Sequence, residues 1–140
     1  MKVEFFVPEI RGKGRPRFTR NGHAFTDKKT RNYENLVKLL AMQAMEKAGA
    51  EVTDKPVKAT IHAYFEIPKS YSKKKVQAII NGEIRPAKPD LDNIIKSCGG
   101  DGCNQIIFKD DVQIYSITAT KSYITNSEKY GVYCCFEWKD

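Results

Sequence analysis

Apolar and polar positions along the chain predict an alternation of strands and helices. Runs rich in β-branched and aromatic residues predict strands at 3–7, 57–67, 112–123 and 130–138. The second of these runs alternates between apolar and polar positions, as expected for a half-buried strand. Between 29 and 48 the apolar residues recur every three or four positions, which predicts an amphipathic helix that Gly49 ends.

Two shorter helices are predicted in the second half of the chain. One runs over 72–80, with Ser72 as N-cap and Asn81-Gly82 as its end. The other begins at Asp90 and continues through Cys98, where the glycines that follow break or loosen it. Together the elements predict an α/β (α+β) fold over 1–140, in which a mixed β-sheet packs against helices in a single domain.

The formal charge of +7 is concentrated in one segment, 11–31, which we name the basic strip. This segment holds eight basic residues and one aspartate, whereas acidic and basic residues cancel in the rest of the chain. Its glycines and proline predict a loop or a loose hairpin around Asn21-Gly22. Such a strip is typical of a phosphate-binding surface, and the alternative is a solvated segment without a ligand. The candidate DNA-binding residues are Lys13, Arg15, Arg17, Arg20, Lys28, Lys29 and Arg31.

Membrane and disulfide-stabilised classes are not indicated. No apolar run approaches the roughly 20 residues that cross a bilayer, and the first residues lack a secretory signal, so we expect a cytoplasmic protein without a membrane partner. The cysteines, Cys98, Cys103, Cys134 and Cys135, do not match structural zinc spacings, and we interpret all four as structural. A Cys98–Cys103 disulfide would require a turn that brings the two together.

Two acidic motifs carry the candidate chemistry. Asp90 and Asp92 stand two residues apart at the start of a predicted helix, and Asp110-Asp111 precedes a predicted strand. Carboxylates without nearby histidines favour Mg²⁺ or Mn²⁺, which can activate water and neutralise a phosphate. Lys96 follows Asp92 by four residues, so on a helix it shares a face with Asp92 and can stabilise charge on the leaving oxygen.

Each acidic residue also has a purely structural interpretation. Asp90 is a natural N-cap, and Asp92–Lys96 is an ordinary pair on a helix surface. Asp110-Asp111 suits a turn before a strand. The joint presence of both motifs beside the basic strip favours the metal-binding interpretation.

The sequence resembles the RusA-type Holliday-junction resolvases, small enzymes mostly encoded by phages and prophages. The resemblance covers most of the chain. It depends on Lys13-Gly14-Arg15-Pro16-Arg17, on Lys88-Pro89-Asp90-Leu91-Asp92-Asn93 followed by Lys96, and on Phe108-Lys109-Asp110-Asp111-Val112-Gln113. It implies a homodimer that binds branched DNA, the four-way junction, and nicks two opposing strands with Mg²⁺.

By motif position, the resemblance implies that Asp90, Asp92 and Asp111 bind the metal, that Lys96 is the catalytic lysine and that Asp110 is a helper. After Lys96 the family typically continues as a helix with Asp-Ala-Leu-Asn, whereas this chain reads Ser97-Cys98-Gly99-Gly100-Asp101-Gly102. We therefore expect the helix to kink or end at these glycines. Two other functions fit the same residues, a broader structure-selective nuclease and a nonenzymatic DNA-binding protein.

Overall fold

A four-stranded mixed sheet forms the centre of the protein. The computed structural model describes residues 1–12, 17–18, 20, 22, 24–25, 28–126 and 128–140. The strands follow the order β1-β6-β4-β5, with β1 (Lys2–Val7), β6 (Gly131–Glu137), β4 (Val57–Phe65) and β5 (Ile114–Tyr123). The pairs β1–β6 and β6–β4 are antiparallel, whereas β4–β5 is parallel. The predicted mixed sheet is confirmed.

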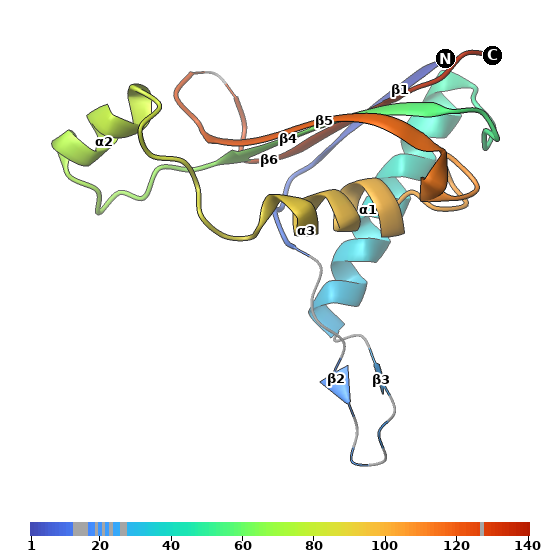
Figure 1. Cartoon of the computed structure of the whole chain (residues 1–140), viewed down its shortest axis with the longest axis horizontal. Coiled ribbons are helices and arrows are strands. Elements are labelled where there is room, and N and C mark those ends of the chain that lie inside the picture. The colour runs from blue at the N-terminus through green and yellow to red at the C-terminus, as the bar shows by residue number, and fades with distance from the viewer. Residues whose placement is uncertain (13–16, 19, 21, 23, 26–27, 127) are drawn as a thin grey trace.

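Helices cover one face of this sheet (Figure 1). The long helix α1 (Lys28–Ala48) and the helix α3 (Leu91–Ile95) lie beneath it, and α3 runs on directly into the π-helix η1 (Lys96–Asp101). The helix α2 (Lys73–Ile80), capped by Ser72, lies beyond one end of the sheet. None of the described helices covers the opposite side, which we call the open face.

Strand alternation decides which residues enter the core. On β4 the side chains of Val57, Ala59, Ile61 and Ala63 are fully buried under the helices. The residues between them, such as Lys58 and His62, lie on the open face, as the alternation predicts. Cys134 and Cys135 point to opposite sides of β6, and Cys134 belongs to the main core. All four cysteines are free, so the Cys98–Cys103 disulfide is absent and the Cys103 thiol donates to the Cys98 carbonyl instead.

The glycine-rich segment continues the helix rather than ending it. The helix predicted to stop at Cys98 extends as η1 to Asp101, in the wider π form. A Cβ atom at Gly99 would lie 2.8 Å from Cδ1 of Ile61, and one at Gly102 would lie 2.3 Å from Cγ1 of Val37. These glycines therefore allow the helix to pack closely against β4 and α1.

One predicted strand begins later than its sequence indicates. Residues 111–113 form a short 3-10 helix, η2 (Asp111–Gln113), and β5 starts at Ile114. The expectation of a strand from Val112 was wrong because Asp110 and Gln113 form a capping box that closes a helical turn.

The described part of the basic strip contains the predicted hairpin. Strands β2 (Arg17–Phe18) and β3 (Ala24–Phe25) pair antiparallel, and Gly22 has a φ of 80° in the connection. The hairpin extends away from the sheet, below the N-terminal end of α1 (Figure 1). Lys13 and Arg15 lie outside the described residues. None of the helices in the described ranges combines the length and hydropathy that crossing a bilayer requires.

Candidate active site

The helix formed by α3 and η1 carries the first acidic motif. Asp90 is the N-cap of α3, and its carbonyl oxygen accepts from the N–H groups of Asn93 and Ile94, each at 3.1 Å. The exposed Asp90 carboxylate makes no capping hydrogen bond. Asp90 is therefore the N-cap residue, as the structural interpretation predicts, but capping does not occupy its carboxylate, which remains available for a ligand.

Asp92 and Lys96 are both exposed one helical turn apart. The ion pairs of the described residues join Met1 to Asp140 and Arg11 to Glu9, and no ion pair joins Asp92 to Lys96. The alternative of an ordinary surface ion pair is not realised. Both charges face solvent on the same side of the helix.

The two residues of the second acidic motif, Asp110 and Asp111, have different roles. Asp110 caps η2, because its Oδ1 accepts from the N–H of Val112 at 3.0 Å. The Oε1 atom of Gln113 accepts in return from the N–H of Asp110 at 3.0 Å. The structural interpretation holds for Asp110, whose carboxylate fixes the turn. Asp111, in the first turn of η2, is the carboxylate that this turn presents.

The Asp111 carboxylate lies against η1. A Cβ atom at Gly100 would stand 3.2 Å from Oδ2 of Asp111. Gly100 follows Lys96 by four residues and Asp92 by eight, so the three positions share one face of the helix. Asp92 and Lys96 are exposed on this face, and the Asp111 carboxylate lies against the buried Gly100 at its end farther from Asp90.

Neighbouring negative charge perturbs the acidic turn. The pKa of Asp111 is raised, chiefly by its hydrogen bond with Asp110 and then by desolvation and the charges of Asp110 and Asp101. The pKa of Asp110 is lowered, first by the Val112 N–H group and then by Asp111. As the pH falls, Asp111 is therefore the member of the pair that takes up a proton first. A cation that relieved this repulsion would bind in competition with that proton.

The fit of a divalent cation can be judged from the donors present. The three predicted ligands offer carboxylate oxygens, which suit Mg²⁺ or Mn²⁺. Within the described residues, no three His, Cys, Asp or Glu side chains are already arranged to hold a metal ion. Asp90, Asp92 and Asp111 are all exposed, so their side chains are free to change rotamer. The donor set fits a hard cation, and coordination by all three would require these carboxylates to turn toward one another.

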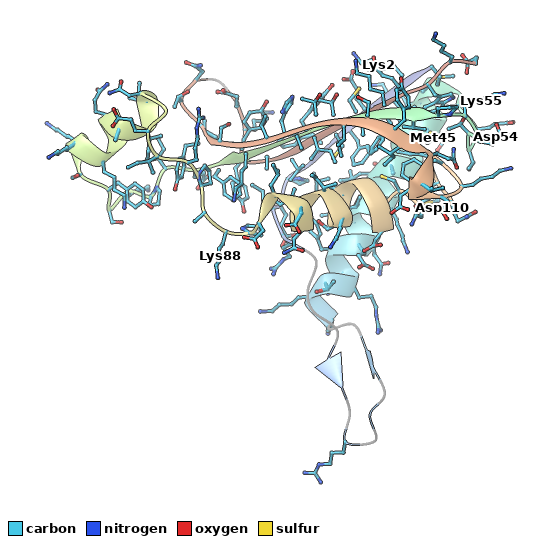
Figure 2. All side chains as sticks on the ribbon, in the orientation of Figure 1. Lys2, Met45, Asp54, Lys55, Lys88 and Asp110 are labelled. Atoms are coloured by element: carbon cyan, nitrogen blue, oxygen red, sulfur yellow. The ribbon has the colours of Figure 1, made fainter. Side chains whose placement is uncertain are left out.

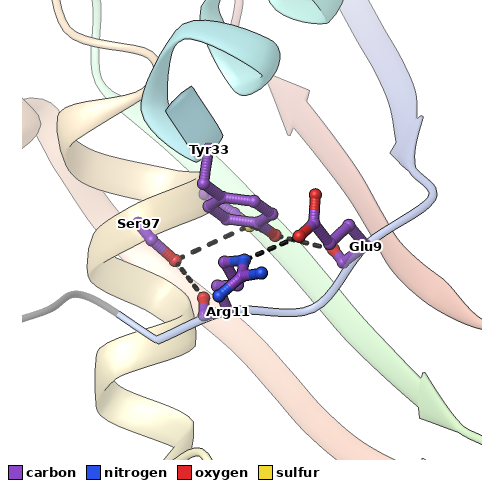
Figure 3. A network of polar contacts seen from close by, with 5 residues as sticks. Glu9, Arg11, Tyr33 and Ser97 are labelled. Carbon is purple, nitrogen blue, oxygen red and sulfur yellow. Dashed lines mark hydrogen bonds and ion pairs between the residues drawn. The ribbon is translucent and has the colours of Figure 1, made fainter. Parts of the chain in front are cut away.

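A polar network ties the start of the basic strip to this helix (Figure 3). The Tyr33 hydroxyl of α1 donates to the carbonyl of Glu9 at 2.8 Å, and the Ser97 hydroxyl of η1 donates to the carbonyl of Arg11 at 2.9 Å. Arg11 in turn pairs with Glu9 at 2.6 Å. Arg11, which begins the basic strip, is thus fixed beside Ser97, the residue that follows Lys96.

Close packing holds the same strip against the acidic motif. A Cβ atom at Gly12 would lie 2.9 Å from Cβ of Pro89 and 3.0 Å from Cβ of Asn93. On the other side of this motif, the Lys121 ammonium of β5 donates to the carbonyls of Ala87 and Pro89. The segment that leads into Asp90 is therefore held between the strip and the sheet.

Comparison with known proteins identifies the family of this chain. The sequence model of the family described as Endodeoxyribonuclease RusA matches residues 8–132. The chain belongs to the RusA family. It is also 35% identical over 116 residues to the uncharacterized protein YqaN of Bacillus subtilis (strain 168), with 79% of each chain covered. As a RusA-family protein the chain is assigned to a group of endodeoxyribonucleases that act on branched DNA.

The RusA match includes the basic strip and both acidic motifs. Sequence reasoning missed the anchoring roles of Tyr33, Ser97 and Lys121, and it gave no role to Asp101 beside Asp111. Tyr33 is buried, and its hydroxyl holds the Glu9 carbonyl. The polar residue after Lys96 was the one available signal, because a serine on the buried side of a helix requires hydrogen-bond partners.

Proposed function

We propose that this RusA-family protein is a divalent-metal-dependent endodeoxyribonuclease that resolves four-way DNA junctions by paired nicks. The observation that supports this best is the single exposed helix face that carries Asp92, Lys96 and the contact with Asp111. Beside it, Ser97 anchors the start of the basic strip. Phosphate-binding charge and carboxylate chemistry are thereby joined in one part of the fold.

Asp90, Asp92 and Asp111 would hold the cation. A bound Mg²⁺ or Mn²⁺ ion supplies positive charge at the scissile phosphate and makes a water more acidic. The protein's own part is to present exposed carboxylates that no cap or ion pair consumes. Asp110 acts as a helper by fixing the turn that presents Asp111.

Lys96 is the residue that we propose to stabilise the transition state. It lies on the face between Asp92 and Gly100, and no carboxylate among the described residues pairs with it. An ammonium group there can interact with a non-bridging oxygen or with the leaving oxygen as negative charge develops. A substrate phosphate bound at this face would lie within reach of the Lys96 ammonium.

The basic strip would bind the phosphate backbone. Arg17 lies on β2 and Arg20 at the turn, while Lys28, Lys29 and Arg31 occupy the exposed start of α1. Basic residues in the first turn of a helix are unfavourable beside the positive end of its dipole. The same arrangement becomes favourable when a phosphate binds, because N–H groups and ammonium groups then contact the anion together.

Paired nicking requires two sites related by a two-fold axis. One domain of 140 residues carries one such site, so we propose a homodimer on the junction.

The decisive test is nicking of a synthetic four-way junction in Mg²⁺ by wild type and by Asp92→Asn. Losing a ligand that neutralises transition-state charge should lower the nicking rate at least about a hundredfold, the equivalent of roughly 3 kcal/mol. Glu66→Gln, which removes an exposed carboxylate at the far end of β4, is the matched control and should nick normally. Undiminished nicking by Asp92→Asn would refute the proposal.

Two further measurements separate this function from its rivals. Calorimetric titration with Mg²⁺ or Mn²⁺ should give binding heat for wild type and much less for Asp90→Asn and Asp111→Asn. Equal heats in all three would favour a nonenzymatic DNA-binding protein. Cleavage rates on a junction, a fork and a linear duplex distinguish a resolvase, which prefers the junction, from a broader structure-selective nuclease.

A further inference from the structure

A second basic concavity lies on the open face of the sheet. It has a volume of about 610 Å³ and is lined by Lys2, Lys55, Lys58, Tyr115, Glu137 and Lys139, among others. The open face lies opposite the face that α1, α3 and η1 cover (Figure 1). None of the residues just named belongs to the basic strip or to the proposed active site.

Charge in this cavity favours an anion. Lys2 and Lys58 flank Glu137 in one row across three strands, because each is the register partner of Glu137. Lys55 and Lys139 add two more positive charges, so four lysines surround one carboxylate. None of these lysines forms an ion pair within the described part of the chain. A polyanion would therefore find a net excess of positive charge there.

Tyr115 gives the cavity an exposed aromatic side chain. Ile114 pairs with Val57 and Ser116 with Lys58, so Tyr115 is the extra residue of a β-bulge. A bulge redirects a side chain out of the regular pleat, and Tyr115 is 70% exposed although it lines a cavity. An exposed ring beside several ammonium groups matches the two parts of a nucleotide, a flat base and a phosphate.

The cavity adjoins the acidic turn across the edge of the sheet. The Gln113 amide donates to the carbonyls of Thr53 and Lys55, at 3.0 and 2.9 Å, which ties the Lys55 loop to η2. Lys55 and Asp110 accordingly lie at the same end of the molecule (Figure 2). Val112, between Asp111 and Tyr115 in the sequence, is 81% exposed. A DNA strand that passes the acidic turn therefore meets the exposed apolar side chain of Val112 before it reaches the cavity.

We propose that this cavity binds a single-stranded DNA segment, with a base stacked on Tyr115 and the flanking phosphates on Lys55 and Lys58. The inference rests on the proposed function only in taking DNA as the substrate. It adds a site for an unpaired strand, one that the junction-cutting proposal does not require. Strands splayed at a branch point would supply such a segment.

The test is fluorescence polarisation with a labelled oligothymidylate in EDTA, where binding is measured without cleavage. Tyr115→Ala should weaken binding about tenfold, and Tyr115→Phe should bind like wild type because it keeps the ring. Replacing Lys55 and Lys58 by glutamine should reduce the slope of log affinity against log salt by roughly 1.4, since each phosphate contact on a single strand contributes about 0.7. The control pair Lys69→Gln with Lys129→Gln makes the same charge change on exposed residues that do not line this cavity.

Several outcomes would overturn the inference. Unchanged binding by Tyr115→Ala, or an equal loss in the control pair, would show that general charge rather than this cavity holds the strand. A lower molecular mass of Tyr115→Ala in sedimentation would show that a second copy of the chain covers the cavity instead. If wild type does not nick junctions, but Tyr115→Ala still weakens oligothymidylate binding, the nuclease function is refuted and this binding site is supported.

Discussion

Replacing Gly102 by alanine tests how the glycine-rich segment packs beneath the sheet. Gly102 has an ordinary helical φ of −74°, so alanine is conformationally acceptable there and its effect is steric. The new Cβ would lie 2.3 Å from Cγ1 of Val37 and 2.9 Å from the carbonyl oxygen of Ser97. Carbon atoms prefer separations of about 3.5–4.0 Å, so the neighbours must move by about 1 Å. Val37 is fully buried and Ser97 is held by hydrogen bonds, so neither can move freely.

Overpacking of this kind costs about 1–3 kcal/mol, and contacts on two sides place Gly102→Ala near the upper end. For a chain of this size, about 3 kcal/mol lowers Tm by roughly 10 °C, measurable by circular dichroism. Gly100→Ala is the matched control, because its Cβ meets only the Asp111 carboxylate, at 3.2 Å. Its stability should stay within about 1 kcal/mol of wild type, since the higher helix propensity of alanine offsets that contact.

The two variants should differ in function as well. Gly100→Ala should fold normally but displace the Asp111 carboxylate, so its Mg²⁺ affinity and nicking rate should fall. A Gly102→Ala protein that melts within about 2 °C of wild type would refute the packing argument. Equal destabilisation of both variants would show that the segment needs glycine for its backbone, not for the contact with α1.

Three further predictions concern the acidic turn and its supports. The raised pKa of Asp111 means that the ionised carboxylate destabilises the fold, so folding stability falls as the pH rises through this pKa. Asp111→Asn removes that carboxylate and should therefore have a higher Tm than wild type near pH 7. That difference should vanish toward about pH 3; a constant difference would contradict the raised pKa of Asp111. Tyr33→Phe removes the donor to the Glu9 carbonyl and should cost about 1 kcal/mol in urea denaturation, and an unchanged midpoint would show that this bond contributes nothing. The Lys121 ammonium group holds the Pro89 carbonyl just ahead of Asp90. Lys121→Met should therefore raise the Mg²⁺ concentration needed for half-maximal nicking and barely change Tm. An unaltered Mg²⁺ requirement would exclude this positioning role.

The fold was largely predictable because its signals are local. The alternation over β4, the apolar spacing of α1 and the hairpin around Gly22 all follow from neighbouring residues. Such patterns fix which face of an element is apolar and therefore which face is buried. The late start of β5 was missed although its signal is also local, because Asp110 and Gln113 form a capping box three residues apart. The tertiary fold adds the bonds from the Gln113 side chain to the carbonyls of Thr53 and Lys55.

The candidate site was predictable in its residues but not in its geometry. The sequence by itself determined that Asp92 and Lys96 share a helix face, because helical spacing alone sets that relation. Only the tertiary structure decided that Asp111 lies against Gly100, that Asp101 adds its charge there, and that Ser97 anchors Arg11 across 86 positions of the chain. The physical reason is that local periodicity depends on backbone geometry within a few residues, whereas contacts between distant segments depend on how whole elements pack.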